Sequence, residues 1–250
     1  PENRLMNRQT PETNLRQSLL QKLEDLQRAG VTHLGHASPQ PPIAADSNAE
    51  RASQPNDPDG DLTILAKEVA ACDRCQELAT SRNQTVFGVG NPHARLCFLG
   101  EAPGAEEDRQ GKPFVGRAGK LLTDILEKGM GISRSDVYIF NILKCRPPGN
   151  RNPHPEESDN CRTFLDRQLA IIAPEFICCL GAVAAHNLLN TTTPIGKLRG
   201  TFHDYLGIRV VCTYHPAYLL RNPPAKKSTW EDIQLLMDAM NIEKPNTEKP

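Results

Sequence analysis

The sequence has no long apolar run and almost no net charge. No stretch of the 250 residues is apolar for long enough to cross a bilayer, so we expect no membrane-spanning segment. A formal net charge of −1 gives no overall attraction to nucleic acid, so binding to such a polymer would need a local basic patch. No basic-then-apolar leader and no internal repeat is visible. We expect a cytoplasmic protein that acts as a monomer.

Cysteine is well represented, although secretory features are lacking. The eight cysteines are therefore expected to be reduced thiols or metal ligands rather than a disulfide framework. Half of them fall inside predicted strands, where a cysteine is usually a small buried hydrophobe: Cys97, Cys178, Cys179 and Cys212. The remaining four are candidate metal ligands: Cys72, Cys75, Cys145 and Cys161.

The spacing of these four thiols favours an iron–sulfur cluster. Cys72 and Cys75 form one compact pair, whereas Cys145 and Cys161 lie far apart in the sequence. Zinc ribbons normally bring two compact pairs, so the pattern predicts one 4Fe-4S cluster, with zinc as the less favoured alternative. We expect the basic neighbours of the last two cysteines to lower the thiol pKa; these are Lys144, Arg146 and Arg162.

The chain divides by composition near residue 60. Residues 1–60 combine one candidate amphipathic helix, with leucines at 15, 19, 23 and 26, with a proline-rich segment that cannot bury enough apolar surface to fold. We interpret this extension as a disordered linker, with residues 10–30 as a candidate docking piece for a protein partner. Residues 61–240 form the predicted globular domain, and residues 241–250 are expected to fray.

Apolar runs alternate with helical patterns through the domain. Strands are expected at 96–99, 137–140, 176–180 and 208–212, and helices at 62–78, 117–127, 155–172, 182–189 and 230–240. This order predicts a three-layer α/β/α sandwich around a central, mainly parallel four-stranded sheet. Gly100, Asn141 and His215 follow three of the strands, so they should meet at the edge where such sheets bind ligands.

Two loops have compositions suited to binding. The loop at 100–116 holds glycines, prolines, acids and one aromatic residue, as a base or sugar pocket does; the alternative is an ordinary strand-to-helix connection with solvated acids. The loop at 146–155 carries Arg146, Arg151 and His154 on proline-stiffened backbone, which suits phosphate contacts. It could equally be a rigid cover for the cluster, and both roles are compatible.

Several motifs occur together in a fixed order: GEAPG at 100–104, GKPFVG at 111–116, Asn141, KCRPPGNR at 144–151, KLRG at 197–200 and HPA at 215–217. With the four cysteines, this set resembles the family 4 uracil-DNA glycosylases, which carry a four-iron cluster. The resemblance covers residues 62–240. It implies a DNA repair enzyme that flips uracil out of single- or double-stranded DNA. The enzyme would hydrolyse the N-glycosidic bond and leave an abasic site.

The resemblance also implies a uracil-binding set: Gly100, Ala102, Glu107, Phe114, Asn141 and His215. Phe114 matches the stacking aromatic, and the Asn141 amide would donate to O4 and accept from N3–H. Glu107 would reject the methyl group of thymine. The alternatives are a core phenylalanine and an ordinary exposed acid.

For catalysis, the resemblance implies that His215 donates to uracil O2 as charge develops there. Glu101 is the expected partner of the attacking water, although backbone groups of the 100–104 loop could serve instead. Leu219, Leu220 and Arg221 are expected to fill the gap left by the flipped base. Lys197 and Arg199, with Arg146 and Arg151, are the expected phosphate contacts.

Two other functions fit parts of this pattern. A related subgroup binds uracil-containing DNA covalently through a basic insertion that ends in histidine, but here residues 115–120 run into the helix without such a histidine. A non-catalytic DNA-binding module with a cluster or zinc is the alternative from another class. The choice between a glycosylase and a non-catalytic module depends on whether the side chains of Glu101, Asn141 and His215 lie around one site.

Overall fold

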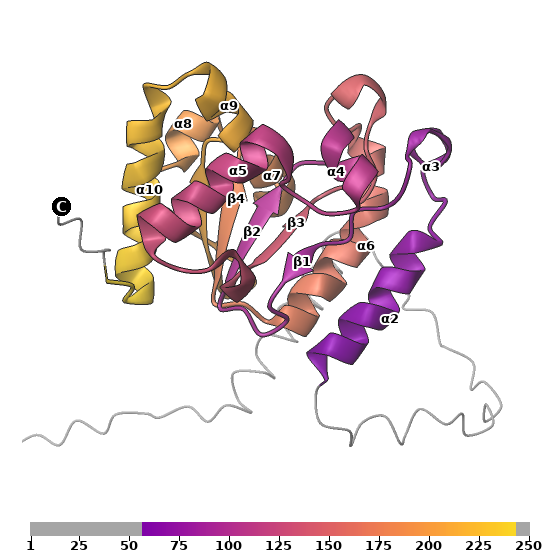
Figure 1. Ribbon diagram of the computed structural model, residues 1–250, viewed down its shortest axis with the longest axis horizontal. Coiled ribbons are helices and arrows are strands. Elements are labelled where there is room, and N and C mark those ends of the chain that lie inside the picture. The colour runs from indigo at the N-terminus through magenta and orange to yellow at the C-terminus, as the bar shows by residue number, and fades with distance from the viewer. Residues whose placement is uncertain (1–56, 244–250) are drawn as a thin grey trace, which may run out of the picture. The chain divides into compact units, whose positions relative to one another are not determined.

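The computed structural model describes residues 57–243, which form an α/β domain with helices on both faces of one sheet (Figure 1). The sheet has the strand order β1-β3-β2-β4-β6-β5. The four inner strands are parallel: β3 (Tyr138–Asn141), β2 (Leu96–Gly100), β4 (Phe176–Leu180) and β6 (Ile208–Thr213). The edge strands β1 (Val89–Gly90) and β5 (Phe202–Tyr205) are antiparallel to their neighbours. The three-layer, mainly parallel prediction is confirmed.

Helices connect the four parallel strands along the chain. They are α2 (Pro58–Ala70), α3 (Gln76–Ser81), α4 (Ala105–Gln110), α5 (Gly116–Asp124), α6 (Pro155–Ile172), α7 (Ala182–Leu189), α8 (Ile195–Leu198), α9 (Pro216–Arg221) and α10 (Ala225–Met240). Shorter helical segments are the π-helix η2 (Ile125–Met130) and the 3-10 turns η3 (Arg134–Asp136) and η4 (Pro148–Asn150).

The core lies on both faces of the sheet because alternate side chains of each strand point to opposite sides. In β2, Cys97 and Leu99 join the apolar cluster under α2, α6 and α7, whereas Leu96 and Phe98 join the cluster under α5, η2 and α10. All five residues of β2 and of β4 are buried. Burial on both faces explains why these strands appear in the sequence as continuous apolar runs.

The predicted four-stranded sheet is wrong in strand number: it has six strands. Both missed strands are at the edges. The strand β1 is only two residues long and contains a glycine, and β5 reads Phe-His-Asp-Tyr and is only partly buried. Edge strands have only one neighbour and less burial, so they carry little of the apolar signal by which the inner strands are predicted.

The single helix predicted at 62–78 is also wrong, since α2 ends at Ala70 and α3 starts at Gln76. Cys72 and Cys75 lie in the connection, where Cys75 has the extended backbone angles φ −113° and ψ 93°. Because of this break, neither thiol is held on a helix face, and the connection can place both sulfurs against the rest of the domain. The helices predicted at 155–172 and 182–189 are present with those bounds, as α6 and α7. The other two are present with shifted ends; α10, for example, starts five residues before Trp230.

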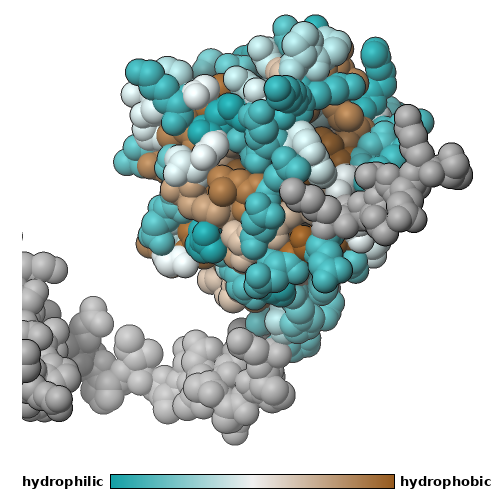
Figure 2. Space-filling view, turned by 90° about the vertical axis from the view of Figure 1, so that its left-hand side faces the viewer, coloured by the Kyte–Doolittle hydropathy of each residue, from teal (hydrophilic) through white to brown (hydrophobic). Residues whose placement is uncertain are grey.

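One side of the domain can be followed by its hydropathy. Figure 2 shows the side on which α10 lies in Figure 1, where hydrophilic side chains surround smaller apolar patches. Among residues 57–243, no helix is both long enough and apolar enough to span a membrane.

Candidate active site

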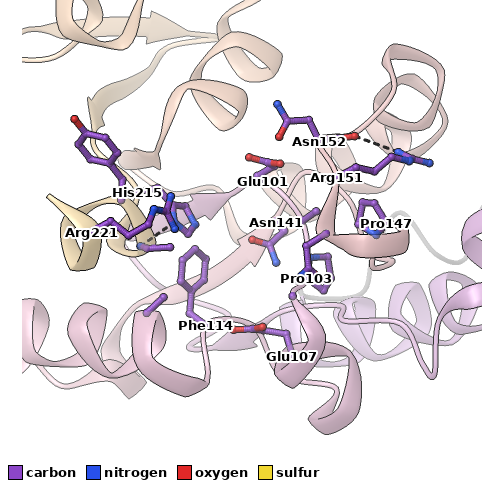
Figure 3. Close-up of a pocket in the computed structure, with 16 residues that line it drawn as sticks. Glu101, Pro103, Glu107, Phe114, Asn141, Pro147, Arg151, Asn152, His215 and Arg221 are labelled. Atoms are coloured by element: carbon purple, nitrogen blue, oxygen red, sulfur yellow. Dashed lines mark hydrogen bonds between the residues drawn. The ribbon is translucent and has the colours of Figure 1, made fainter.

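A cavity of about 430 Å³ opens at the carboxyl ends of β2, β3 and β6. Glu101, Asn141 and His215, which end or follow these strands, all line it. Figure 3 shows the Phe114 ring beside His215, with the Asn141 amide and both glutamates, Glu101 and Glu107, around the same space. The convergence expected from the strand order is therefore present.

The Asn141 side chain carries an unused hydrogen-bonding atom at the base of the cavity. The residue is 2% exposed, and its Oδ1 atom accepts no hydrogen bond from any described residue. A buried polar atom without a partner costs free energy, and such atoms are usually satisfied by protein, water or a ligand. Four buried side-chain atoms of the described residues lack a partner, and Asn141 Oδ1 is the one whose residue lines this cavity. Lys144 holds the backbone here, because its buried Nζ donates to the Asn141 carbonyl oxygen over 2.7 Å. The contact fixes the backbone from which the amide projects.

The Phe114 ring forms one wall, with its centroid 5.5 Å from that of the His215 ring and the planes tilted by 34°. Phe114 is buried and has a left-handed backbone, with φ at +50°. Gly100 lies below the ring: a Cβ at this position would overlap both Phe114 and Asn141 Oδ1. Only glycine therefore fits at the end of β2.

His215 is held as a neutral imidazole. Its Nδ1 accepts a hydrogen bond of 3.1 Å from the backbone N–H of Ala217, which leaves the proton on Nε2. Burial, with the positive charge of Arg221 as a second cause, lowers the pKa of His215 to about 4. The side chain can therefore donate from Nε2 without carrying a charge.

Two glutamates face the cavity with different roles in the structure. Burial raises the pKa of Glu101, which makes its carboxylate a stronger base than an exposed glutamate. Glu107 accepts a hydrogen bond of 3.1 Å from the N–H of Val115. This contact joins α4 to the turn before α5 and so helps to shape the cavity.

The four candidate thiols gather on one side of this cavity. Cys145 and Cys161 pack with Leu143, and Cys75 lies against the same cluster. Cys72 is close enough for its charge to act on both Cys75 and Cys145. The other four cysteines are completely buried in β2, β4 and β6, as predicted: Cys97, Cys178, Cys179 and Cys212.

The predicted lowering of the thiol pKa is wrong. Burial raises the pKa of Cys75, Cys145 and Cys161, the last to about 11. Arg146 and Arg162 face other partners, Asn150 and Asp166. Of the predicted basic neighbours, Lys144 does lower the pKa of Cys161, but burial has the larger effect. Arg82 is the second cation near the thiols: its Nη1 lies 3.0 Å from the Cys145 sulfur, and its Nη2 donates to the Cys72 carbonyl. Sequence proximity could not reveal Arg82.

Comparison with known proteins identifies the family. Residues 87–234 match the model of the uracil DNA glycosylase superfamily. A type-4 uracil-DNA glycosylase of Thermotoga maritima is 48% identical over 177 residues, which are 69% of this chain and 91% of the relative. A type-4 enzyme of Saccharolobus solfataricus is 43% identical over 188 residues, 72% of this chain and 87% of the relative. The chain belongs to the uracil DNA glycosylase superfamily. A type-5 uracil-DNA glycosylase of Pyrobaculum aerophilum is more distant, at 33% identity over 147 residues, 52% of this chain and 64% of the relative.

The structure brings together the residues that were expected to line the pocket. Several of the residues expected to contact DNA, however, are paired with or packed against other parts of the protein. The pocket lining includes Ala102, Glu107 and Phe114 in addition to the three strand-end residues. Arg151 also lines the pocket, yet its guanidinium is paired with Glu77 at 2.8 Å and with Glu157 at 2.6 Å. Its predicted phosphate contact would require these ion pairs to open.

The Glu77, His154 and Glu157 side chains place three potential metal-ligand atoms within 4.8 Å of one another. The guanidinium of Arg151 already donates to both carboxylates. This grouping is therefore an arginine–glutamate network that braces the loop at 146–155 rather than a second metal centre.

Two other predicted DNA contacts have structural roles instead. Arg199 is only 17% exposed and donates to Asp232 Oδ2, which also accepts from Thr213 at the end of β6. Leu219 is 1% exposed, so it cannot enter a base stack as a wedge. Lys197, Leu220 and Arg221 remain at least partly accessible.

The structure also shows a pocket residue that the sequence did not indicate. Tyr218 is 39% exposed on α9, lines the cavity and stacks on Tyr214 with 5.1 Å between ring centroids. In the sequence it stands in an apolar stretch beside two leucines. Only the helical phase of α9 determines that Tyr218 faces outwards while Leu219 faces the core.

Proposed function

We propose that this protein is a uracil-DNA glycosylase of DNA repair, which extrudes uracil from DNA and hydrolyses its N-glycosidic bond. The observation that carries this proposal is the buried, unpartnered Oδ1 atom of Asn141 in a cavity shared with Phe114 and the neutral His215. A base in duplex DNA is inaccessible until it leaves the stack, so a pocket of this kind serves a flipped nucleotide.

Base recognition is assigned to the floor and walls of this cavity. The Asn141 amide would accept from uracil N3–H through Oδ1 and donate to O4, a pattern opposite to the one that cytosine requires. Phe114 would stack on the base, and Gly100 provides the clearance for both groups. Glu107, fixed by Val115, is assigned to the wall that rejects a methyl group on the base, and Ala102 completes the lining.

Cleavage breaks the bond between C1′ and the base nitrogen, and the bonding electrons move onto the uracil ring. The Nε2–H of His215 would donate to uracil O2, where negative charge develops, and would stabilise the departing anion. A water oxygen then bonds to C1′, and Glu101 accepts the water proton as a general base. The raised pKa of Glu101 suits this role.

The DNA backbone would approach from the side of α9. Arg221 and Lys197 are exposed, and among the described residues no carboxylate is paired with either. We assign phosphate contacts to these two cations, and Arg146 retains this role at the rim of the loop. Leu220 and Tyr218 are the candidates for the wedge.

The test of this function is uracil release from oligonucleotides. The purified protein should release free uracil from both single- and double-stranded DNA and leave an abasic site that alkali cleaves. Matched oligonucleotides with thymine or cytosine in place of uracil should stay intact. Binding to uracil-containing DNA without release would support the non-catalytic module instead.

The four thiols fit a 4Fe-4S cluster better than zinc. Among the described residues, no three cysteine sulfurs lie within 4.8 Å of one another. One tetrahedral zinc holds its thiolates about 3.8 Å apart at a Zn–S distance near 2.3 Å. In a cluster each thiolate binds a different iron, which separates the sulfurs further. We assign Cys72, Cys75, Cys145 and Cys161 as the ligands and a structural role to the cluster, which would tie the loop at 146–155 and the start of α6 to the connection between α2 and α3.

Cys145→Ala should therefore lose folded protein rather than one chemical step. Anaerobically purified wild-type protein is expected to contain about four irons per chain. Cys97→Ala, which removes a completely buried thiol inside β2, should retain the iron. Zinc without iron in the wild type would overturn the cluster. A fully folded Cys145→Ala protein that had selectively lost cleavage would overturn its structural role.

A further inference from the structure

The backbone of Phe114 is strained where the pocket needs its ring. Its φ of +50° lies in the left-handed region, which residues with a bulky side chain seldom adopt. Such a conformation persists only where surrounding contacts enforce it. A left-handed Phe114 is therefore informative about which neighbours hold the ring in place.

Two of these contacts come from the elements beside the turn. Glu107 accepts from the Val115 N–H and fixes the peptide that follows Phe114. The helix α5 approaches closely, because a Cβ at Gly119 would overlap the Phe114 carbonyl oxygen. Neither contact uses the Pro113 carbonyl, and neither provides a donor for the Phe114 carbonyl.

Arg134 supplies those donors from outside the cavity. Its Nη2 donates to the carbonyl oxygens of Pro113 and Phe114, over 2.8 and 3.0 Å. Its Nη1 donates to Thr123 Oγ1 over 3.2 Å, and Thr123 in turn donates to the Gly119 carbonyl. One side chain thus joins both carbonyls of the strained turn to the helix packed against it.

Arg134 gives all its side-chain hydrogen bonds to this turn and to α5 rather than to a carboxylate. It lies in the η3 turn, twenty residues after Phe114, and is half-buried. Partial burial lowers the pKa of Arg134 and the charge of Glu127 acts to raise it, but within residues 57–243 no carboxylate forms an ion pair with the guanidinium. The carbonyl oxygens of Pro113 and Phe114 are therefore its main partners.

We propose that Arg134 is a positioning residue for uracil binding: it locks the Pro113–Phe114 turn in the left-handed conformation and so fixes the stacking ring. It touches neither the base nor the sugar. The proposal rests on the proposed function, because it assumes that Phe114 stacks on uracil. The guanidinium contacts both carbonyls through Nη2 and Thr123 through Nη1, whereas a lysine ammonium has a single nitrogen and cannot make both sets of contacts in this planar geometry.

The test compares Arg134→Met and Arg134→Lys with the wild type, using equilibrium binding of free uracil and of abasic-site DNA. Loss of the positioned stack should weaken uracil binding roughly tenfold in Arg134→Met, with a smaller effect in Arg134→Lys. Binding of abasic-site DNA, which lacks the base, should stay unchanged. Arg95→Met is the matched control, since Arg95 forms an exposed bidentate pair with Glu175 before β2. It should change neither affinity.

A double substitution separates positioning from general stability. In a Phe114→Ala background the ring is absent, so adding Arg134→Lys or Arg134→Met should weaken uracil binding no further. The proposal would be overturned if the Phe114 and Arg134 substitutions each weakened uracil binding by independent factors that multiply in the double variant. An unchanged uracil affinity in the single Arg134 variants would also overturn it. Equal losses for uracil and abasic-site DNA would do so as well. If Arg134→Met fails to fold, Arg134→Lys alone decides.

The proposed function is tested separately by the wild type. Wild-type protein that binds free uracil but releases none from DNA would reject the glycosylase function and leave the Arg134 comparison valid. Wild-type protein that does not bind uracil would reject both.

Discussion

His215→Ala is expected to slow uracil release about a hundredfold while DNA binding changes little. An electrostatic donor of this type is worth roughly 3 kcal/mol of transition-state stabilisation. Its contact with O2 strengthens only as charge moves onto the base, so the bound ground state loses little. Single-turnover rates measured beside binding constants for uracil-containing DNA separate the two effects.

His93→Ala is the control, because His93 is exposed in the turn before β2, at the opposite end of that strand from the cavity. This variant should cleave at the wild-type rate. Should His215→Ala lose affinity in proportion to rate, with an unchanged chemical step, His215 would only position the substrate.

The neutral state of His215 also sets an expected pH dependence. Its pKa of about 4 in the folded protein lies below the ordinary value of 6.5, so cleavage should show no loss from histidine protonation between pH 7 and pH 5. In the unfolded chain the same histidine binds its proton at higher pH. The free energy of unfolding should therefore fall as pH drops from about 6.5 to about 4. His215→Ala should lack this contribution, which denaturant titrations at several pH values would measure.

Asn141→Asp is expected to have the larger effect on recognition. The substitution places a carboxylate oxygen opposite uracil O4, where the amide would donate, in a site that is 2% exposed. A pocket with mismatched, buried hydrogen-bonding groups discriminates by about 10⁴-fold. Uracil cleavage should fall by about that factor, and the ratio of cytosine to uracil cleavage should rise, because the cytosine amine can donate to the carboxylate.

Asn152→Asp makes the same chemical change at an exposed position on the rim of the same cavity. It should leave the ratio of cytosine to uracil cleavage unchanged. Rates on paired oligonucleotides, with thermal unfolding of each variant, separate recognition from stability. Near-wild-type cleavage of uracil by a folded Asn141→Asp protein would remove Asn141 from base recognition.

Much of the inner fold was predictable from local sequence. The bounds of β4 were predicted as Phe176–Leu180, and β2 differs only by the added Gly100. These strands are covered on both faces, so every residue in them is apolar or small and the signal is continuous. The helical break between Ala70 and Gln76 was not predictable in the same way, because distant residues contact this connection: Arg74 donates to the Asn160 carbonyl, and Arg82 donates to the Cys72 carbonyl.

The candidate site was likewise predictable only in part. Gly100, Asn141 and His215 could be assigned to one sheet edge from strand order alone, since parallel strands present their carboxyl ends together. Burial and the Ala217 N–H decide that His215 is neutral, and these depend on the packing around α9. The left-handed Phe114 and its contact with Arg134 likewise have no local sequence signal.

The sequence by itself determined which chemical groups are present and which strand ends they follow, because those properties depend on neighbouring residues. Only the tertiary structure decided which cations are available to DNA. Arg151 pairs with Glu77, 74 residues away, and Arg199 with Asp232, 33 residues away, so both are committed to the protein. A charge is free or paired according to what the fold brings within reach of it, and contacts over such separations have no periodicity or composition that a linear pattern can reveal.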